Sequence, residues 1–299
     1  MAELVEDAPD ITTISIERSM VYGKRTALVG VLTHGSRDAE AMWVNRPCAV
    51  ILNGGIIHKI GPGRLTVRLA RSLAAAGFDA FRFDFAGVGD SPNRTDGRSL
   101  ADGIIIDVEE TLDHLQDVLG YRRFVLMGLC SGADNGMRAA EHDPRVAGLI
   151  MLDPTIERTA RWYFQRLYGW LSSWTFLKSV MLFRHPKYRE VWAAMRGNAV
   201  DEEGEKPELY QVAYSNREDI KRCLGGLLAR DVQLFVAISG TWSFIYNYRN
   251  QFFDVYPELD FRDRLTLHYR PEADHMYYRD EQRLWLLGAV TQWMRSRFS

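Results

Sequence analysis

The stretch RRFVLMGLCSGAD, residues 122–134, passes from an apolar run through a short glycine-framed turn into a helical pattern. Gly128 and Gly132 stand two positions before and two positions after Cys130. Glycines at these positions leave room for a tight strand-to-helix turn whose central residue has a strained backbone. Such a turn projects the side chain of Cys130 above the carboxyl edge of a sheet. The N–H of the next residue, Ser131, then points to where a negatively charged oxygen would form.

Strand and helix patterns alternate on both sides of this turn. Apolar runs that predict buried strands lie at 48–55, 78–85, 122–129, 146–153, 232–239 and 265–270. Segments with helical spacing follow several of these runs, and the last helix is expected at 281–294. Two extended segments at 12–17 and 27–33 predict an antiparallel pair before the first buried strand. The alternation predicts an α/β protein with a mostly parallel sheet and helices on both faces.

The alternation is interrupted between residues 155 and 230 by an aromatic-rich helical segment. We expect a helical cap at 155–230 inserted into a core formed by 1–154 and 231–299. An aromatic side chain in this cap either fills its core or lines a pocket for substrate. The substrate-binding candidates are Trp162, Trp170, Trp174 and, from the core, Trp242.

Composition limits the classes of partner and compartment. The net charge of −2 over 299 residues gives no electrostatic argument for binding nucleic acid. The three cysteines, Cys48, Cys130 and Cys223, form no CxxC pair, so neither a disulfide framework nor a metal site is expected. The acidic N-terminus lacks an apolar core and no window reaches about 18 apolar residues, so we expect no signal peptide and no membrane span. A cytoplasmic location follows as an expectation.

A histidine downstream of the turn is the candidate partner of Cys130. His275 lies in the loop after the last predicted strand and is the last histidine of the chain. A nucleophile that comes first and a histidine that comes last is an order known for catalytic triads. Ser131 would attack instead of Cys130 only if the turn shifted by one residue, which would break the symmetric glycine frame. The alternative without chemistry is a glycine-rich turn around a buried, inert cysteine.

Four pieces together resemble the α/β-hydrolase superfamily over nearly the whole chain. They are NGG (53–55), FDFAGVGDS (83–91), GLCSG (128–132) and His275. The second piece is similar to the Asp-x-x-Gly-x-Gly-x-Ser segment of that superfamily. A cysteine at the turn resembles the dienelactone hydrolase branch, whereas the Asn-Gly-Gly piece and the helical cap look closer to serine-aminopeptidase-like and exosortase-associated hydrolases. The resemblance implies an α/β-hydrolase fold.

The resemblance also implies roles for individual residues. Cys130 matches the nucleophile of the family, and His275 matches its general base. The N–H of Ser131 matches one donor of the oxyanion hole. The second donor is expected in the loop after the first buried strand, as the N–H of Gly55 or of Ile56.

The acid that would support the histidine departs from the family pattern. The usual window after the strand at 232–239 holds no carboxylate, and the first acidic residue beyond it is Asp254. Asp153, at the end of the strand at 146–153, is able to reach the same side of the imidazole, and we favour it over Asp254. Its alternative role is to cap the inserted helix. A Cys–His pair without an acid also remains competent, because a thiolate is a good nucleophile at neutral pH.

The expected function is hydrolysis of an ester or thioester of an apolar acyl group through an acyl-enzyme on Cys130. An acyltransferase that passes the group to an amine or alcohol is one alternative, and a non-catalytic ligand-binding or accessory protein is the other. The substrate is expected to be a small molecule, and linkage to coenzyme A or a carrier stays open. No cofactor is expected, since neither a GxGxxG strand-helix turn nor a Walker A sequence is present. An apolar cap surface also leaves a homodimer open.

Overall fold

The computed structural model describes residues 16–35, 46–171 and 216–299. Its eight-stranded sheet has the order β1-β2-β4-β3-β5-β6-β7-β8. The strands are β1 (Glu17–Tyr22), β2 (Leu28–Thr33), β3 (Cys48–Ile51), β4 (Ala80–Asp84), β5 (Phe124–Leu129), β6 (Val146–Leu152), β7 (Gln233–Ser239) and β8 (Leu265–Arg270). The α-helices are α1 (Leu65–Ala75), α2 (Leu100–Leu119), α3 (Ser131–His142), α4 (Ala160–Leu171), α7 (Arg217–Ala229), α8 (Gln251–Val255) and α9 (Asp280–Phe298).

Strand pairing confirms the mostly parallel sheet that the alternation predicts. The six strands β4-β3-β5-β6-β7-β8 are parallel to their neighbours. In contrast, β2 pairs antiparallel with both β1 and β4. The first strand begins later than the expected 12–17, because Tyr22 pairs with Leu28 directly across the turn at Gly23. Pairing outward from that turn puts the strand over Glu17–Tyr22, and 12–15 lie outside the described residues.

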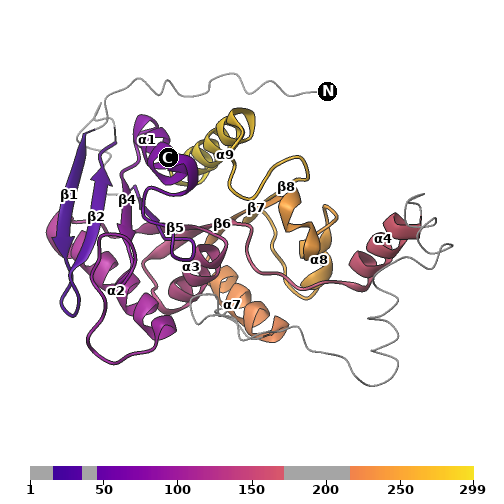
Figure 1. Ribbon diagram of the computed structural model, residues 1–299, viewed down its shortest axis with the longest axis horizontal. Coiled ribbons are helices and arrows are strands. Elements are labelled where there is room, and N and C mark those ends of the chain that lie inside the picture. The colour runs from indigo at the N-terminus through magenta and orange to yellow at the C-terminus, as the bar shows by residue number, and fades with distance from the viewer. Residues whose placement is uncertain (1–15, 36–45, 172–215) are drawn as a thin grey trace, which may run out of the picture.

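Helices cover both faces of the sheet, as Figure 1 shows. Side chains that alternate along β5 pack into two different clusters: Phe124 and Leu126 with α2, α3 and α7, and Val125 and Met127 with α1 and α9. A strand buried on both faces is a near-continuous apolar run, which is the pattern read from the sequence. The carboxyl ends of the parallel strands meet at one edge, where loops are free to carry functional groups.

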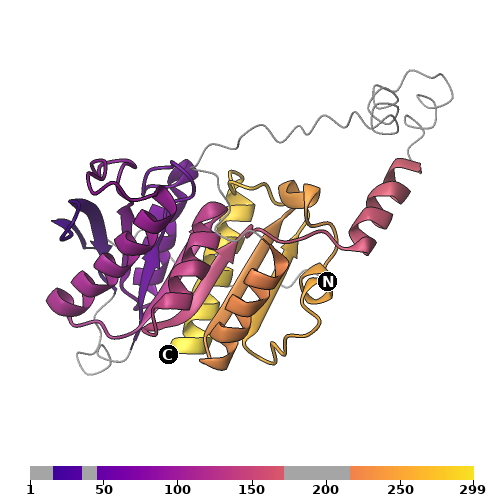
Figure 2. The ribbon, with the colours of Figure 1, turned by 90° about the horizontal axis from the view of Figure 1, so that it is seen from below.

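The two described helices of segment 155–230 pack differently. On α7, Cys223 and Leu224 are buried in the cluster that includes α3, so this helix packs with the core although it falls inside the segment assigned to the cap. A crossover helix is what joins the parallel strands β6 and β7. In contrast, α4 stands away from the sheet, and its Phe164 and Tyr168 are exposed (Figure 2). Among the described helices, none has the length and apolar character needed to cross a membrane.

Candidate active site

Cys130 lies between the end of β5 and the start of α3, with a backbone at φ 57° and ψ −126°. A non-glycine residue at positive φ costs on the order of 1–3 kcal/mol and persists only where its surroundings enforce it. Here the surroundings are close-packed backbone. A Cβ on Gly128 would lie 2.1 Å from the carbonyl of Gly132, and a Cβ on Gly132 would lie 2.5 Å from the carbonyl oxygen of Asn53. The glycine frame of the sequence therefore corresponds to steric necessity at both positions.

His275 and Asp153 meet at the same edge of the sheet. Asp153 directly follows β6 and is fully buried, and His275 lies in the loop between β8 and α9. The Nδ1 atom of His275 is 2.6 Å from Oδ2 of Asp153, and the imidazole also hydrogen-bonds Cys130. Because a carboxylate only accepts hydrogen bonds, Nδ1 carries the proton, which leaves Nε2 for the sulfur.

The last residue of β7 and a residue just after that strand hold these two groups in place. Ser239 donates from its backbone N–H to Oδ1 of Asp153 at 2.6 Å, and from its hydroxyl to Oδ2 at 2.7 Å. The backbone N–H of His275 donates to the hydroxyl of Thr241 at 3.2 Å. Both residues lie in the window after the strand at 232–239, where the family pattern has its acid and this sequence has no carboxylate. Their hydroxyls were the signal, because a buried carboxylate needs donors.

The charges around His275 determine its protonation. Burial lowers the pKa of His275, but the hydrogen bonds and negative charges of Asp153 and Cys130 outweigh burial and raise that pKa to about 9. With this pKa the ring of His275 is an imidazolium at neutral pH. A positively charged imidazole next to a cysteine stabilises the thiolate form, which is the form that attacks acyl groups.

The other candidate acid lies elsewhere. Asp254 is part of α8, its side chain is 44% exposed, and it faces Arg161 at 4.0 Å. Within the described residues, Asp153 is the carboxylate that contacts His275.

The tryptophans proposed as substrate ligands have diverse positions. Trp162 is buried, and its Nε1–H donates to the carbonyl of Ser243 at 3.2 Å, so it anchors α4 to the segment after β7. Trp242 stacks on His275. Trp170 belongs to the last turn of α4, and Trp174 lies outside the described residues.

The loop after β3 carries the two candidates for the second oxyanion donor. The N–H of Gly55 donates to the hydroxyl of Ser131 at 2.7 Å, so this donor already has an acceptor. The side chain of Ile56 points outward and is 58% exposed. The sequence predicts the backbone N–H of Ser131 as an oxyanion donor and offers its hydroxyl only as an alternative nucleophile. The contact of that hydroxyl with Gly55 joins two distant segments, so no local pattern predicts it.

Asp84 fixes the path of this loop, which sequence reasoning did not foresee. Its carboxylate accepts from Asn53 Nδ2 at 2.9 Å, from the backbone N–H of Lys59 at 2.6 Å and from Lys59 Nζ at 2.7 Å. His58, Asp84 and Asp90 are close enough together to hold a cation. The ammonium of Lys59 contacts all three, however, and thereby supplies the positive charge itself. The motif FDFAGVGDS, which contains Asp84 and Asp90, was the available signal.

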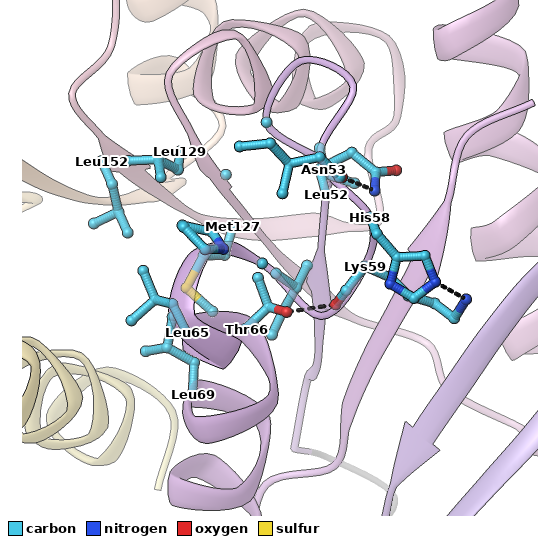
Figure 3. A pocket seen from close by; sticks show the side chains of 16 residues that line it. Leu52, Asn53, His58, Lys59, Leu65, Thr66, Leu69, Met127, Leu129 and Leu152 are labelled. Carbon is cyan, nitrogen blue, oxygen red and sulfur yellow. Dashed lines mark hydrogen bonds between the residues drawn. The ribbon is translucent and has the colours of Figure 1, made fainter. Parts of the chain in front are cut away.

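A small apolar cavity lies beneath the same loop, and Figure 3 shows the residues that line it. Its volume is about 30 Å³. Side chains of α1 and of the ends of β5 and β6 form most of its wall, including Leu65, Leu69, Met127, Leu129 and Leu152. Gly54 and Lys59 from the loop close the other side. The cavity therefore adjoins the residue before Cys130 and is suited to apolar groups.

Comparisons with known proteins identify the family and the fold. A family model described as alpha/beta hydrolase fold matches residues 49–230. Est1E from Butyrivibrio proteoclasticus, solved with ferulic acid bound, is 15% identical and aligns over 93% of this chain and 98% of its own, with a TM-score of 0.57. The Pyrococcus furiosus esterase Pf2001 is 12% identical over 97% of this chain and 93% of its own, with a TM-score of 0.61.

Alpha/beta hydrolase domain-containing protein 10 from mouse is also similar in structure. It is 14% identical over 93% of this chain and 99% of its own, with a TM-score of 0.55. At such low identities these structures share the fold with this chain. A search of curated proteins gave no match.

Proposed function

The chain belongs to the alpha/beta hydrolase fold family, and we propose that it cleaves an ester or thioester of an apolar acyl group through an acyl-enzyme on Cys130. The observation that carries the proposal is the constellation of Cys130, His275 and Asp153 at one edge of the sheet. In this proposal Cys130 is the nucleophile, His275 the general base and acid, and Asp153 the group that orients the imidazole.

The first half of the reaction acylates the cysteine. The thiolate of Cys130 attacks the carbonyl carbon, a carbon–sulfur bond forms, and the π electrons move onto the carbonyl oxygen. When this tetrahedral intermediate collapses, the bond to the alcohol or thiol breaks, and His275 gives its proton to the leaving group.

The second half of the reaction hydrolyses the acyl-enzyme. Neutral His275 removes a proton from water, which attacks the thioester. The acid leaves, and the Cys130 thiolate and the imidazolium are restored.

Backbone donors would stabilise the oxyanion in both halves. The N–H of Ser131 at the start of α3 is the first donor, where the helix dipole also favours negative charge. The N–H of Gly55 or of Ile56 is the second. For Gly55 to serve, the hydroxyl of Ser131 must turn away from it, since that hydroxyl now occupies the donor.

The apolar acyl group is proposed from the apolar surroundings of the site: Trp242 covers His275, and an apolar cavity adjoins Leu129, although neither Cys130 nor His275 lines that cavity. The cap tryptophans Trp162, Trp170 and Trp174 remain predicted contacts for a larger substrate.

Turnover of a matched substrate series tests the proposal. p-Nitrophenyl esters and acyl-coenzyme A thioesters of increasing chain length would be incubated with the wild type, Cys130→Ala and Cys223→Ala. Cys223 is the matched control, because it is a buried cysteine on α7 whose thiol donates to the carbonyl of Met137. We expect hydrolysis by the wild type and by Cys223→Ala, and none above background by Cys130→Ala.

Three other results would decide between this proposal and its alternatives. Full turnover by Cys130→Ala would refute the nucleophile. Acylated products that form only when an amine or alcohol is added would identify an acyltransferase. Saturable binding of these compounds without any turnover by the wild type would identify an accessory protein.

A further inference from the structure

The indole of Trp242 lies flat against the imidazole of His275. The ring centroids are 4.5 Å apart and the planes differ by 8°. Trp242 belongs to the short helix η4 (Gly240–Phe244), which follows β7, whereas His275 follows β8. The contact therefore joins two loops at the edge of the sheet where Cys130 lies.

Other contacts fix the indole independently of the histidine. Its Nε1–H donates to the carbonyl of Pro154 at 3.0 Å. The indole also packs edge-to-face with the ring of Phe244, with centroids 4.8 Å apart and planes at 65°. Pro154 is the neighbour of Asp153. The same turn after β6 thus supports both the carboxylate that binds the imidazole edge and the indole that covers the imidazole face.

Asp153 meets the imidazole at its Nδ1 edge, whereas the indole covers a face of the ring. Asp153 and Cys130 hydrogen-bond to the ring, and both favour its positively charged form. Tyr277, which is buried close to Asp153, has a pKa raised well above its usual value by burial and is neutral throughout the accessible range. An aromatic face attracts a cation through its quadrupole, and this attraction is stronger where water is excluded. The indole is therefore placed to stabilise an imidazolium and to block rotation of the ring.

We propose that Trp242 is a positioning residue for His275, holding the imidazole in the plane shared by Asp153 and Cys130 and favouring its protonated form. This differs from a contact with substrate, which the sequence suggested for Trp242. Its effect on turnover rests on the proposed function, whereas the stacking on a titrating imidazolium does not.

Fluorescence tests the stacking without any substrate. A protonated imidazole quenches a stacked indole, so Trp242 should brighten as His275 loses its proton. The emission of Trp242 would be obtained as the difference between the wild type and Trp242→Phe from pH 6 to 10.5. We expect a rise centred near pH 9, the pKa of His275, and no rise in the same difference measured in a His275→Gln background.

A second histidine–tryptophan pair provides the control. Trp285 meets His268 edge-on, with centroids 5.3 Å apart and planes at 80°. Trp285→Phe should leave the rise near pH 9 unchanged. A flat difference signal for Trp242 in the wild type, or a rise that persists in His275→Gln, would overturn the proposal.

Kinetics then test the positioning role. Trp242→Leu removes the aromatic face and should lower the alkaline limit of kcat/KM by about 0.5–1 pH unit, with a loss of about tenfold at neutral pH. Trp242→Phe keeps an aromatic face and should stay within about threefold of the wild type. Unchanged rate and pH profile in Trp242→Leu would refute the role. If the wild type shows the fluorescence rise but turns over no substrate, the stacking of Trp242 on a titrating His275 is supported and the proposed function is refuted.

Discussion

Ser239 donates two hydrogen bonds to the carboxylate of Asp153, one from its backbone N–H at 2.6 Å and one from its hydroxyl at 2.7 Å. Ser239 ends β7, where the family pattern usually has the acid itself, and Asp153 follows the neighbouring strand β6. Because the carboxyl ends of adjacent parallel strands lie side by side, a carboxylate on either strand is able to reach the same imidazole nitrogen. In this chain β6 supplies the charge and β7 supplies its donors.

Replacing the carboxylate tests this assignment. Asp153→Asn removes the charge that holds the imidazolium, and we expect kcat/KM to fall roughly 100-fold, less than the loss of about 10⁴ known for a serine triad because a thiolate depends less on the acid. Asp254→Asn is the matched control and should stay near wild-type activity. Near-wild-type rates for both variants would mean that neither carboxylate supports His275.

The pH profile should depend on which atom is at position 130. The pKa of His275 is raised to about 9, so the imidazolium persists as the pH rises through neutrality and is lost above about 9. The activity of the wild type should therefore fall above pH 9. In Cys130→Ser the hydroxyl is neutral and His275 must be neutral to act as a base, so the weak residual activity should rise with pH. Parallel profiles of kcat/KM for the two proteins would contradict the thiolate–imidazolium pair.

The hydroxyl of Ser131 is expected to compete with the oxyanion. Ser131→Ala frees the N–H of Gly55, and we expect kcat/KM to rise about three- to tenfold, the equivalent of one hydrogen bond of about 1 kcal/mol. Stopped-flow acylation rates would measure the change. A fall of more than tenfold would show instead that the hydroxyl organises the site, and loss of all acylation would revive Ser131 as the nucleophile.

The loop after β3 should depend on Asp84 for stability. Asp84→Asn places an amide donor against the buried ammonium of Lys59, and we expect the free energy of unfolding at neutral pH to drop by about 2–4 kcal/mol. Asp90 also pairs with Lys59 but its side chain is 60% exposed, so Asp90→Asn should cost less than about 1 kcal/mol. Urea unfolding would measure both. Equal losses would contradict the role of Asp84 as the buried anchor.

Local patterns in the sequence are sufficient to predict the fold class. The structure confirms the parallel sheet that the buried apolar runs and the helical spacing between them predict. The glycines around Cys130 correspond to the close backbone contacts at Gly128 and Gly132. The bounds 155–230 of the cap stay a prediction, although α7 within them packs with the core. On sequence alone α7 reads as part of a helical insertion, because nothing local distinguishes a crossover helix from a cap helix.

The contacts within the candidate site were harder to predict, since they join distant segments. The choice between Asp153 and Asp254 depends on the path of the chain after β7, which the structure turns through η4 into α8. The stacking of Trp242 on His275 and the contact between Ser131 and Gly55 have no local signature either. The catalytic roles of these residues stay predictions.

The central claim is that an acyl group becomes bonded to Cys130. The most direct measurement is the intact mass of the protein quenched in acid within seconds of mixing with a p-nitrophenyl ester, followed by peptide mapping. We predict one added acyl group in the wild type and in Cys223→Ala, located on the peptide that contains Cys130, and none in Cys130→Ala. Acylation that persists in Cys130→Ala, or that maps to Ser131 in the wild type, would contradict the account.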